Sequence, residues 1–178
     1  MWADLSPEDR RIADAANRAL AFEGPLRTRV EEVMAFARTL GAHTVGVAFC
    51  SSLSFEARIF CSVLRDNGFA VESVICKNGS HAPDDLGIAS PKPAGEDCVV
   101  CNPIVQAELL NEAKTGLNVI MGLCPGHDSL FIRHSEAPVT VMAVRDFAAG
   151  HNPLAPLYQH EAHFRRIHDA SLPPELTA

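Results

Sequence analysis

Six cysteines are the residues of this 178-residue sequence most able to do chemistry. Small disulfide-stabilised domains reach about 8–10% cysteine, so six cysteines in a chain of this length are too few for a disulfide framework. The amino-terminal residues lack the basic and apolar pattern of a signal peptide, which predicts a cytoplasmic protein with reduced thiols. In that compartment, cysteines more often bind metals or take part in catalysis than form disulfides.

Four of these cysteines occupy equivalent positions in the predicted elements. Cys50, Cys76 and Cys124 each end a predicted strand, and Cys101 directly precedes Asn102, the expected cap of a helix. In an open parallel sheet, the carboxyl ends of the strands and the starts of the following helices lie along one edge, where ligands bind. The sequence therefore predicts that these four thiols meet at one edge of a sheet.

Thiolates that crowd together at such an edge need a compensating cation. Backbone N–H groups and helix dipoles lower cysteine pKa values there, but several thiolates repel one another unless a soft metal is present. Sites rich in sulfur select zinc, Cu(I) or iron–sulfur clusters. We therefore expect three or four of these thiols to hold an iron–sulfur cluster or zinc, beside a small-ligand site.

The number of ligands bears on whether the chain is an enzyme, which the sequence leaves open. Three cysteine ligands would leave a coordination position for a substrate, as in an enzyme of sulfur or redox chemistry. Four would favour a structural or electron-transfer centre. A metal-free thiol hydrolase or transferase is the alternative, with Cys124 or Cys101 as nucleophile and His127 or His151 as base. A non-enzymatic module that binds a small ligand is a third interpretation.

The segment from Gly122 to Ser129 has the highest density of reactive residues. Gly126 allows a sharp turn from strand to helix, and backbone N–H groups near Asp128 and Ser129 can form an anion-binding nest. His127 is the candidate proton donor. Asp128 is the second candidate catalytic residue, with the cap of the following helix as its alternative role.

Other residues are assigned by their places near the same edge. Glu56 could face it, with a first-turn dipole partner as the alternative, and His151 could approach it from the loop after the last strand. Cys61 lies within a helix and is expected to pack in the core, whereas Cys98 is either a further ligand or an exposed loop thiol. The predicted ligand-binding residues are Ser51, Glu56, Asn102, Gly126, Ser129 and His151.

The elements that must position these residues alternate along the chain. Apolar runs rich in β-branched residues predict buried strands at 43–50, 70–76, 117–124 and 138–144. Apolar stripes and capping residues predict helices at 6–23, 28–41, 51–67, 104–115 and 128–134, and a polar one near 158–170. This order predicts an α/β fold with an open, mainly parallel, Rossmann-like sheet and helices on both faces. We expect a single domain over 1–178, with amino-terminal helices (1–41), an α/β core (42–146) and a tail (147–178).

Composition limits the partners. The net charge is −7, and the adjacent arginines at Arg10–Arg11 and Arg165–Arg166 are isolated pairs rather than a basic cluster, so nucleic acid is an unsuitable partner. No apolar run approaches the ~18 residues that span a bilayer, so we expect no membrane partner. His160, His163 and His168 in the tail are expected to form a solvated face. A small-molecule ligand or substrate is the expected partner, with a homodimer left open.

Several segments together resemble one family of uncharacterised bacterial and archaeal proteins, domain-of-unknown-function family 1847, which is commonly labelled metal-binding. The resemblance spans roughly Arg11 to Tyr158 and implies that Cys50, Cys76, Cys101 and Cys124 matter, together with His127 and Asp128. Many members begin with a separate cysteine-rich segment, whereas this chain has no cysteine before Cys50. The segments that carry the resemblance are Val47-Ala-Phe-Cys50, Cys101-Asn-Pro-Ile-Val-Gln-Ala-Glu108, Gly122-Leu-Cys124-Pro-Gly-His127-Asp-Ser-Leu-Phe131, Ala137-Pro-Val-Thr140 and Gly150-His-Asn-Pro153.

Overall fold

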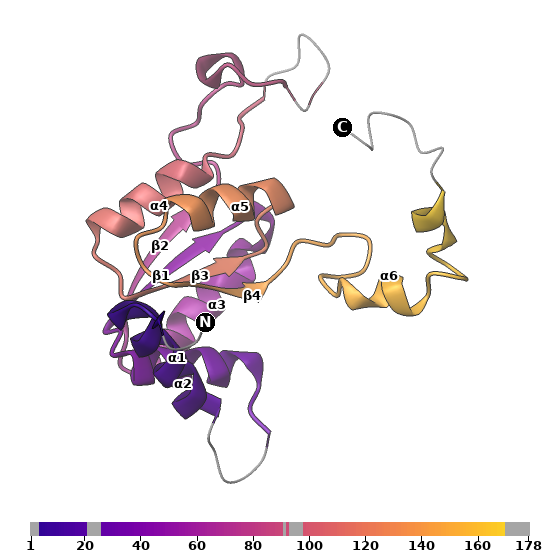
Figure 1. The fold of residues 1–178 in the computed structure, drawn as a ribbon. Coiled ribbons are helices and arrows are strands. Elements are labelled where there is room, and N and C mark those ends of the chain that lie inside the picture. The colour runs from indigo at the N-terminus through magenta and orange to yellow at the C-terminus, as the bar shows by residue number, and fades with distance from the viewer. Residues whose placement is uncertain (1–3, 21–25, 91, 93–97, 170–178) are drawn as a thin grey trace.

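Four parallel strands form one open sheet in the computed structural model, which describes residues 4–20, 26–90, 92 and 98–169. The spatial order is β2-β1-β3-β4 (Figure 1). The strands are β1 (Thr44–Phe49), β2 (Ala70–Ile75), β3 (Leu117–Met121) and β4 (Val139–Ala143). β1 and β3 are central and largely buried, as expected for apolar runs covered on both sides. The α/β fold with a parallel sheet is confirmed.

Helices cover both faces of the sheet, as the sequence predicts (Figure 1). One face carries α1 (Pro7–Leu20), α2 (Arg29–Leu40) and α3 (Ser54–Asp66), which bury the larger apolar cluster. The other face carries α4 (Pro103–Glu112) and α5 (Pro125–His134). The smaller cluster beneath these two helices contains Ala48, Cys50, Cys76, Ala107, Leu110, Ile120, Leu123 and Phe131.

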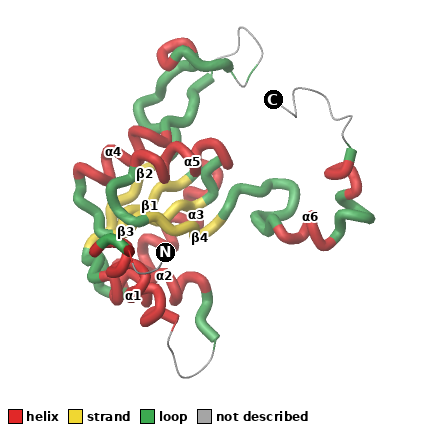
Figure 2. Tube along the Cα trace, in the orientation of Figure 1, coloured by secondary structure: helices red, strands yellow, loops and turns green. Residues whose placement is uncertain are grey.

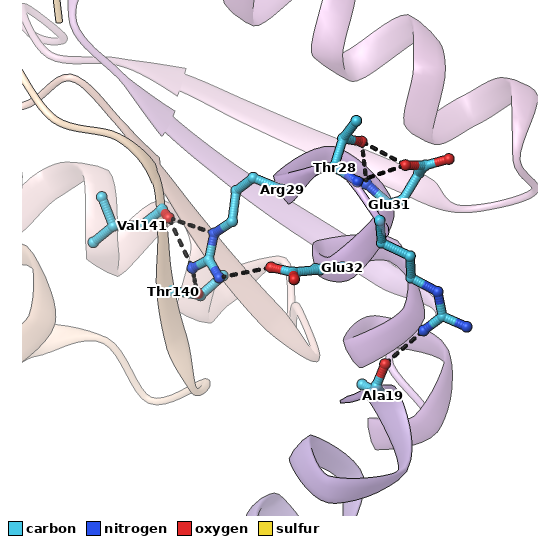
Figure 3. Close-up of polar contacts among 8 residues, drawn as sticks. Ala19, Thr28, Arg29, Glu31, Glu32, Thr140 and Val141 are labelled. Carbon is cyan, nitrogen blue, oxygen red and sulfur yellow. Dashed lines mark hydrogen bonds and ion pairs between the residues drawn. The ribbon is translucent and has the colours of Figure 1, made fainter. Parts of the chain in front are cut away.

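The predicted start of α2 is confirmed, and its first residue also ties the helix to an edge strand. Thr28 and Glu31 form the expected capping box, with the Thr28 backbone N–H donating to the Glu31 carboxylate at 2.7 Å. The Arg29 guanidinium donates to the Val141 carbonyl at 3.0 Å and to the Thr140 hydroxyl at 2.8 Å (Figure 3). Arg29 thereby satisfies one backbone carbonyl and one side-chain hydroxyl of β4, which has no strand on its outer side.

Two helices that lead away from the carboxyl edge begin differently from the prediction. A 3-10 turn, Ser51–Leu53, precedes α3, so Ser51 and Ser52 are not its caps. α5 begins at Pro125 with Cys124 as N-cap, so Asp128 lies in the first turn rather than at the cap. Proline is favoured at the first helical position because its fixed φ suits the helix and its missing N–H would have no partner there.

The turn between β3 and α5 also differs from the prediction. β3 ends at Met121 rather than Cys124, and Gly122 adopts φ 68°. Gly126, which the sequence assigns to the turn, lies within α5. The positive φ belongs to Gly122 because the chain leaves the sheet there, three residues before the helix begins.

Residues 144–169 extend away from the sheet at its carboxyl edge, as does the described part of the connection from β2 to α4 (Figure 2). The long polar helix expected near 158–170 is not formed: α6 spans Leu154–Tyr158, and a 3-10 helix spans Arg165–His168. The end of the expected helix, Ala170, lies outside the described residues. Among the described helices, none has the length and apolar character needed to cross a membrane.

Candidate thiol site at the carboxyl edge

Cys76 lies at the centre of the thiol site. It follows the last residue of β2, and its backbone N–H donates to the Phe49 carbonyl at 2.9 Å, which extends the pairing with β1. Its side chain is 1% exposed. The sulfur accepts a hydrogen bond from the Ser51 N–H at 3.4 Å, and the Cys76 thiol lies close enough to those of Cys50 and Cys101 to shift the pKa values of both. Cys76 is therefore next to two other cysteines.

Cys50 follows β1 and lies between two neighbouring strands. Its backbone N–H donates to the Met121 carbonyl of β3 at 3.0 Å, and the Ser52 hydroxyl donates to its sulfur at 3.1 Å. Burial opposes ionisation of this thiol, but the hydrogen bonds from Ser52, Cys76 and Ser51 outweigh it. The pKa of Cys50 therefore lies below its ordinary value, and this thiol ionises more readily than a free cysteine.

Cys101 approaches Cys76 from the start of α4. The backbone N–H of Asn102 donates to the Cys76 carbonyl at 2.8 Å, while its side-chain oxygen caps α4 by accepting from the Val105 N–H at 3.1 Å. Burial, the hydrogen bond to Cys76 and the neighbouring cysteines raise the pKa of Cys101 to about 12. Without a cation, Cys101 therefore stays a neutral thiol.

Cys124 completes the group as the N-cap of α5. Burial raises the pKa of Cys124; the positive charge of Arg145 opposes this shift, while Cys50, Cys76 and Asp128 add to it. The four predicted cysteines thus lie within electrostatic range of one another at the carboxyl edge. Their mutual effect is the one expected of crowded acids, because ionising one makes ionising the next harder.

His127 and Asp128 lie in the first turn of α5 beside Cys124. Burial and the charge of Arg145 lower the pKa of His127, so its imidazole is neutral near pH 7 and accepts a proton rather than donates one. Burial raises the pKa of Asp128 to about 6. The Asp128 Oδ1 atom is buried and has no hydrogen-bond partner among the described residues. Both side chains are therefore mainly deprotonated near pH 7, and Asp128 keeps its proton to a higher pH than an ordinary carboxyl group does.

The remaining predicted residues differ in how close they come to the thiols. Ser51 and Asn102 contact Cys76 through their backbone N–H groups. Gly126 borders open space, while the exposed Ser129 donates its hydroxyl to the Pro125 carbonyl at 3.1 Å. Glu56 is exposed in the first turn of α3.

The structure also describes His151 and the two remaining cysteines, Cys61 and Cys98. The Nδ1 atom of His151 lies 3.2 Å from the Val144 carbonyl oxygen, within its own loop. Cys61 is buried in the larger apolar cluster, on the other face of the sheet from Cys76, as its core assignment predicts. Cys98 is half-buried.

Sequence reasoning missed two residues of this site. Ser52 donates to the Cys50 sulfur, and Arg145 acts electrostatically on both Cys124 and His127. Arg145 lies two residues after the end of β4, so the strand-end rule that selected the cysteines could have found it. The Arg145 guanidinium also lies over the Phe147 ring, 4.3 Å from its centroid.

All six cysteines are free thiols. Within the described residues, no three His, Cys, Asp or Glu side chains are grouped so that they could hold a metal ion. Cavities of about 290 and 230 Å³ lie elsewhere, at the amino edge of the sheet and between α1, α2 and β4. Neither is lined by any of the four cysteines.

Comparisons with known proteins agree with the resemblance seen in the sequence. The family model described as "Protein of unknown function (DUF1847)" matches residues 2–142, which include all four edge cysteines. An uncharacterized protein of Methanocaldococcus jannaschii is 38% identical over 151 residues, covering 85% of this chain and 77% of that protein. No solved structure matches the chain. Because the family model covers most of its length, the chain belongs to this family of proteins of unknown function, DUF1847.

Proposed function

We propose that the chain is a thiolate protein that binds an iron–sulfur cluster or a zinc ion through Cys50, Cys76, Cys101 and Cys124, next to a site for a small ligand. The observation that carries this proposal is the proximity of Cys76 to both Cys50 and Cys101, whose pKa values it shifts. The three residues come from different segments of the chain, so their convergence is a tertiary feature.

The type of donor suits a soft metal centre, although the described side chains are not grouped around a metal position in the metal-free chain. Thiolates are the preferred ligands of iron–sulfur clusters and common ligands of zinc. In the metal-free protein, burial and the neighbouring cysteines keep Cys101 and Cys124 neutral by raising their pKa values. A bound cation favours the thiolate form and so removes this penalty. Metal binding would therefore release protons.

Hydrogen bonds to sulfur are a second feature in favour of the proposal. Cys50 accepts from the Ser52 hydroxyl, and Cys76 accepts from the Ser51 N–H. Such donors stabilise thiolate charge and tune the electronic properties of thiolate-bound metals. When bound, the centre would supply electron transfer or Lewis acidity. The chain would supply neutral His127 to accept a proton, Asp128 as a carboxyl group that takes up a proton just below neutral pH, and Arg145 to attract an anionic ligand.

Metal content and spectra test the proposal. The full chain is purified without oxygen, then reconstituted with iron and sulfide or with zinc alone, and analysed for bound metal and absorption. We expect a stoichiometric centre that Cys76→Ser abolishes and that Cys50→Ser, Cys101→Ser or Cys124→Ser weakens. Cys61→Ala is the matched control because Cys61 lies on the other face of the sheet. Full metal content in all four serine variants, or none in the unaltered chain, would refute the proposal.

Metal-free thiol chemistry is the second candidate, and one observation favours a particular nucleophile. The hydrogen bonds to Cys50 lower its pKa, whereas the pKa values of Cys101 and Cys124 are raised. The nucleophile would therefore be Cys50 rather than Cys101 or Cys124. Limited alkylation with iodoacetamide near pH 7 tests this: Cys50 should be labelled before Cys101 and Cys124, and equal labelling would argue against it.

A further inference from the structure

Cys50 and Cys76 are opposed across neighbouring parallel strands. β1 pairs with β2 in an unbroken register from Thr44 opposite Ala70 to Phe49 opposite Ile75. One residue further, this register places Cys50 opposite Cys76. The backbone remains extended there, because Cys50 has φ −75° and ψ 144°. The hydrogen bond from the Cys76 N–H to the Phe49 carbonyl continues the pairing to this point.

This arrangement places the two residues at a distance suited to a disulfide. Neighbouring strands lie about 4.7–4.9 Å apart, and residues joined by a disulfide have Cα atoms about 4.4–6.8 Å apart. Both side chains belong to the cluster on the α4 and α5 face of the sheet. The Cys76 thiol is also close enough to Cys50 to affect the pKa of Cys50. A bond between them therefore needs no rearrangement of the strands.

The distance between Cys76 and Cys101 is not set by strand pairing in this way. Cys101 lies in an irregular segment before α4, where no strand pairing fixes its position relative to Cys76. Accessibility also differs within the opposed pair: Cys50 is 9% exposed and Cys76 is 1% exposed. A small oxidant therefore reaches Cys50 first, and Cys76 is in place to react with the product.

We propose that Cys50 and Cys76 are an oxidant-sensitive pair that forms a disulfide when the metal-free protein meets a hydroperoxide. In the first step, the Cys50 thiolate attacks one peroxide oxygen of hydrogen peroxide. An S–O bond forms, the O–O bond breaks, and the leaving hydroxide takes a proton to become water. The product is a sulfenic acid on Cys50.

In the second step, the Cys76 sulfur loses its proton and attacks the Cys50 sulfur. The S–S bond forms, the S–O bond breaks, and the hydroxide again leaves as water. Overall, two thiols are oxidised and one peroxide is reduced to two waters. The disulfide removes two of the four proposed metal donors, so oxidation would block the site. The pairing itself does not depend on the metal proposal, because it concerns the metal-free chain.

Tryptic peptide mapping tests this pairing directly. Cleavage after Arg38, Arg58, Arg65 and Lys77 places Cys50, Cys61 and Cys76 in three separate peptides, each with a single cysteine. The full chain is stripped of metal with a chelator, treated with hydrogen peroxide, blocked with iodoacetamide, denatured and digested. We expect peptides 39–58 and 66–77 to be linked, and dithiothreitol to separate them.

Variants identify the partners. Cys50→Ser and Cys76→Ser should each abolish this link, while Cys101→Ser and Cys61→Ala should retain it. A Cys76–Cys101 link as the main product, a link between two chains, or oxidation without any disulfide would overturn the proposal. Mapping of the unaltered chain decides these outcomes even if a variant fails to fold. A chain that binds no metal but forms the disulfide would refute the function proposed above and leave this inference intact.

Discussion

Cys76 contributes more to the thiol site than its neighbours because of its position between them. Its thiol shifts the pKa values of Cys50 and Cys101, and its carbonyl accepts a hydrogen bond from the Asn102 N–H. Cys124 interacts with the group through electrostatics. The four cysteines therefore have equivalent places in the sequence but different roles in the site.

Asp128 gives a pH-dependent prediction at the scale of one residue. Burial raises its pKa from 3.8 to about 6, so the folded chain holds this proton more tightly than the unfolded chain. The resulting stabilisation is complete below about pH 3.8 and is lost as the pH rises through about 6. We expect the melting temperature of metal-free Asp128→Asn to exceed that of the unaltered chain above pH 6 and to approach it near pH 4. Circular dichroism melts across this range test the prediction, which a pH-independent difference would contradict.

At the scale of elements, the site depends on how the chain turns from each strand into the next helix. Gly122 at the end of β3 has φ 68°, and a Cβ atom there would collide with the buried Leu53 side chain. Leu53 ends the 3-10 turn that also contains Ser51 and Ser52. The turn after β3 and the turn after β1 are therefore packed against each other, which fixes the donors that surround Cys50.

Replacing Gly122 tests this packing. Gly122→Ala should lower the free energy of unfolding by at least about 1–2 kcal/mol, the cost of a left-handed backbone for a residue with a side chain, and the contact with Leu53 adds to this loss. Urea unfolding measures the change. Gly126→Ala is the matched control, since Gly126 is helical and borders open space; alanine favours a helix over glycine by about 0.5–1 kcal/mol. Equal destabilisation by both variants would contradict this account.

At the scale of the whole molecule, the segment after β4 is joined mainly to itself. The Gln159 N–H donates to the Ala155 carbonyl, and the Phe164 N–H donates to the Gln159 carbonyl. The Nδ1 atom of His160 lies 2.9 Å from the Nε2 atom of His168. Leu157 and Tyr158 on α6 are 57% and 76% exposed. The segment extends away from the sheet (Figure 1), so the sheet and its two helical layers do not depend on it.

Removal of residues 154–178 tests this independence. We expect the shortened chain to unfold cooperatively, with a melting temperature within a few degrees of that of the full chain. The deletion removes no residue of either apolar cluster and none of the four edge cysteines. Thermal and urea unfolding followed by circular dichroism measure this. A large loss of stability or of cooperativity would show that the segment supports the core.

Much of the fold follows from local patterns in the sequence. The apolar, β-branched run before Cys50 can bury both faces only as an inner strand, and Thr28 with Glu31 specifies the start of α2 through adjacent hydrogen bonds. The sequence predicts that α5 begins at Asp128, whereas the helix begins at Pro125. Both residues suit the first turn of a helix, and which of them starts it depends on where β3 ends.

The sequence by itself determined that four cysteines stand at equivalent strand and helix ends, because strand periodicity and helix caps are local properties of the chain. Only the tertiary structure decided which of these cysteines are neighbours. The strand order β2-β1-β3-β4 makes β1 and β2 neighbours and so opposes Cys50 to Cys76. Burial and hydrogen bonding then set how readily these side chains ionise. Burial raises the pKa values of Asp128 and Cys101, and hydrogen bonds lower the pKa of Cys50. Neither strand order nor burial is a local property, because both depend on contacts between residues far apart in the chain.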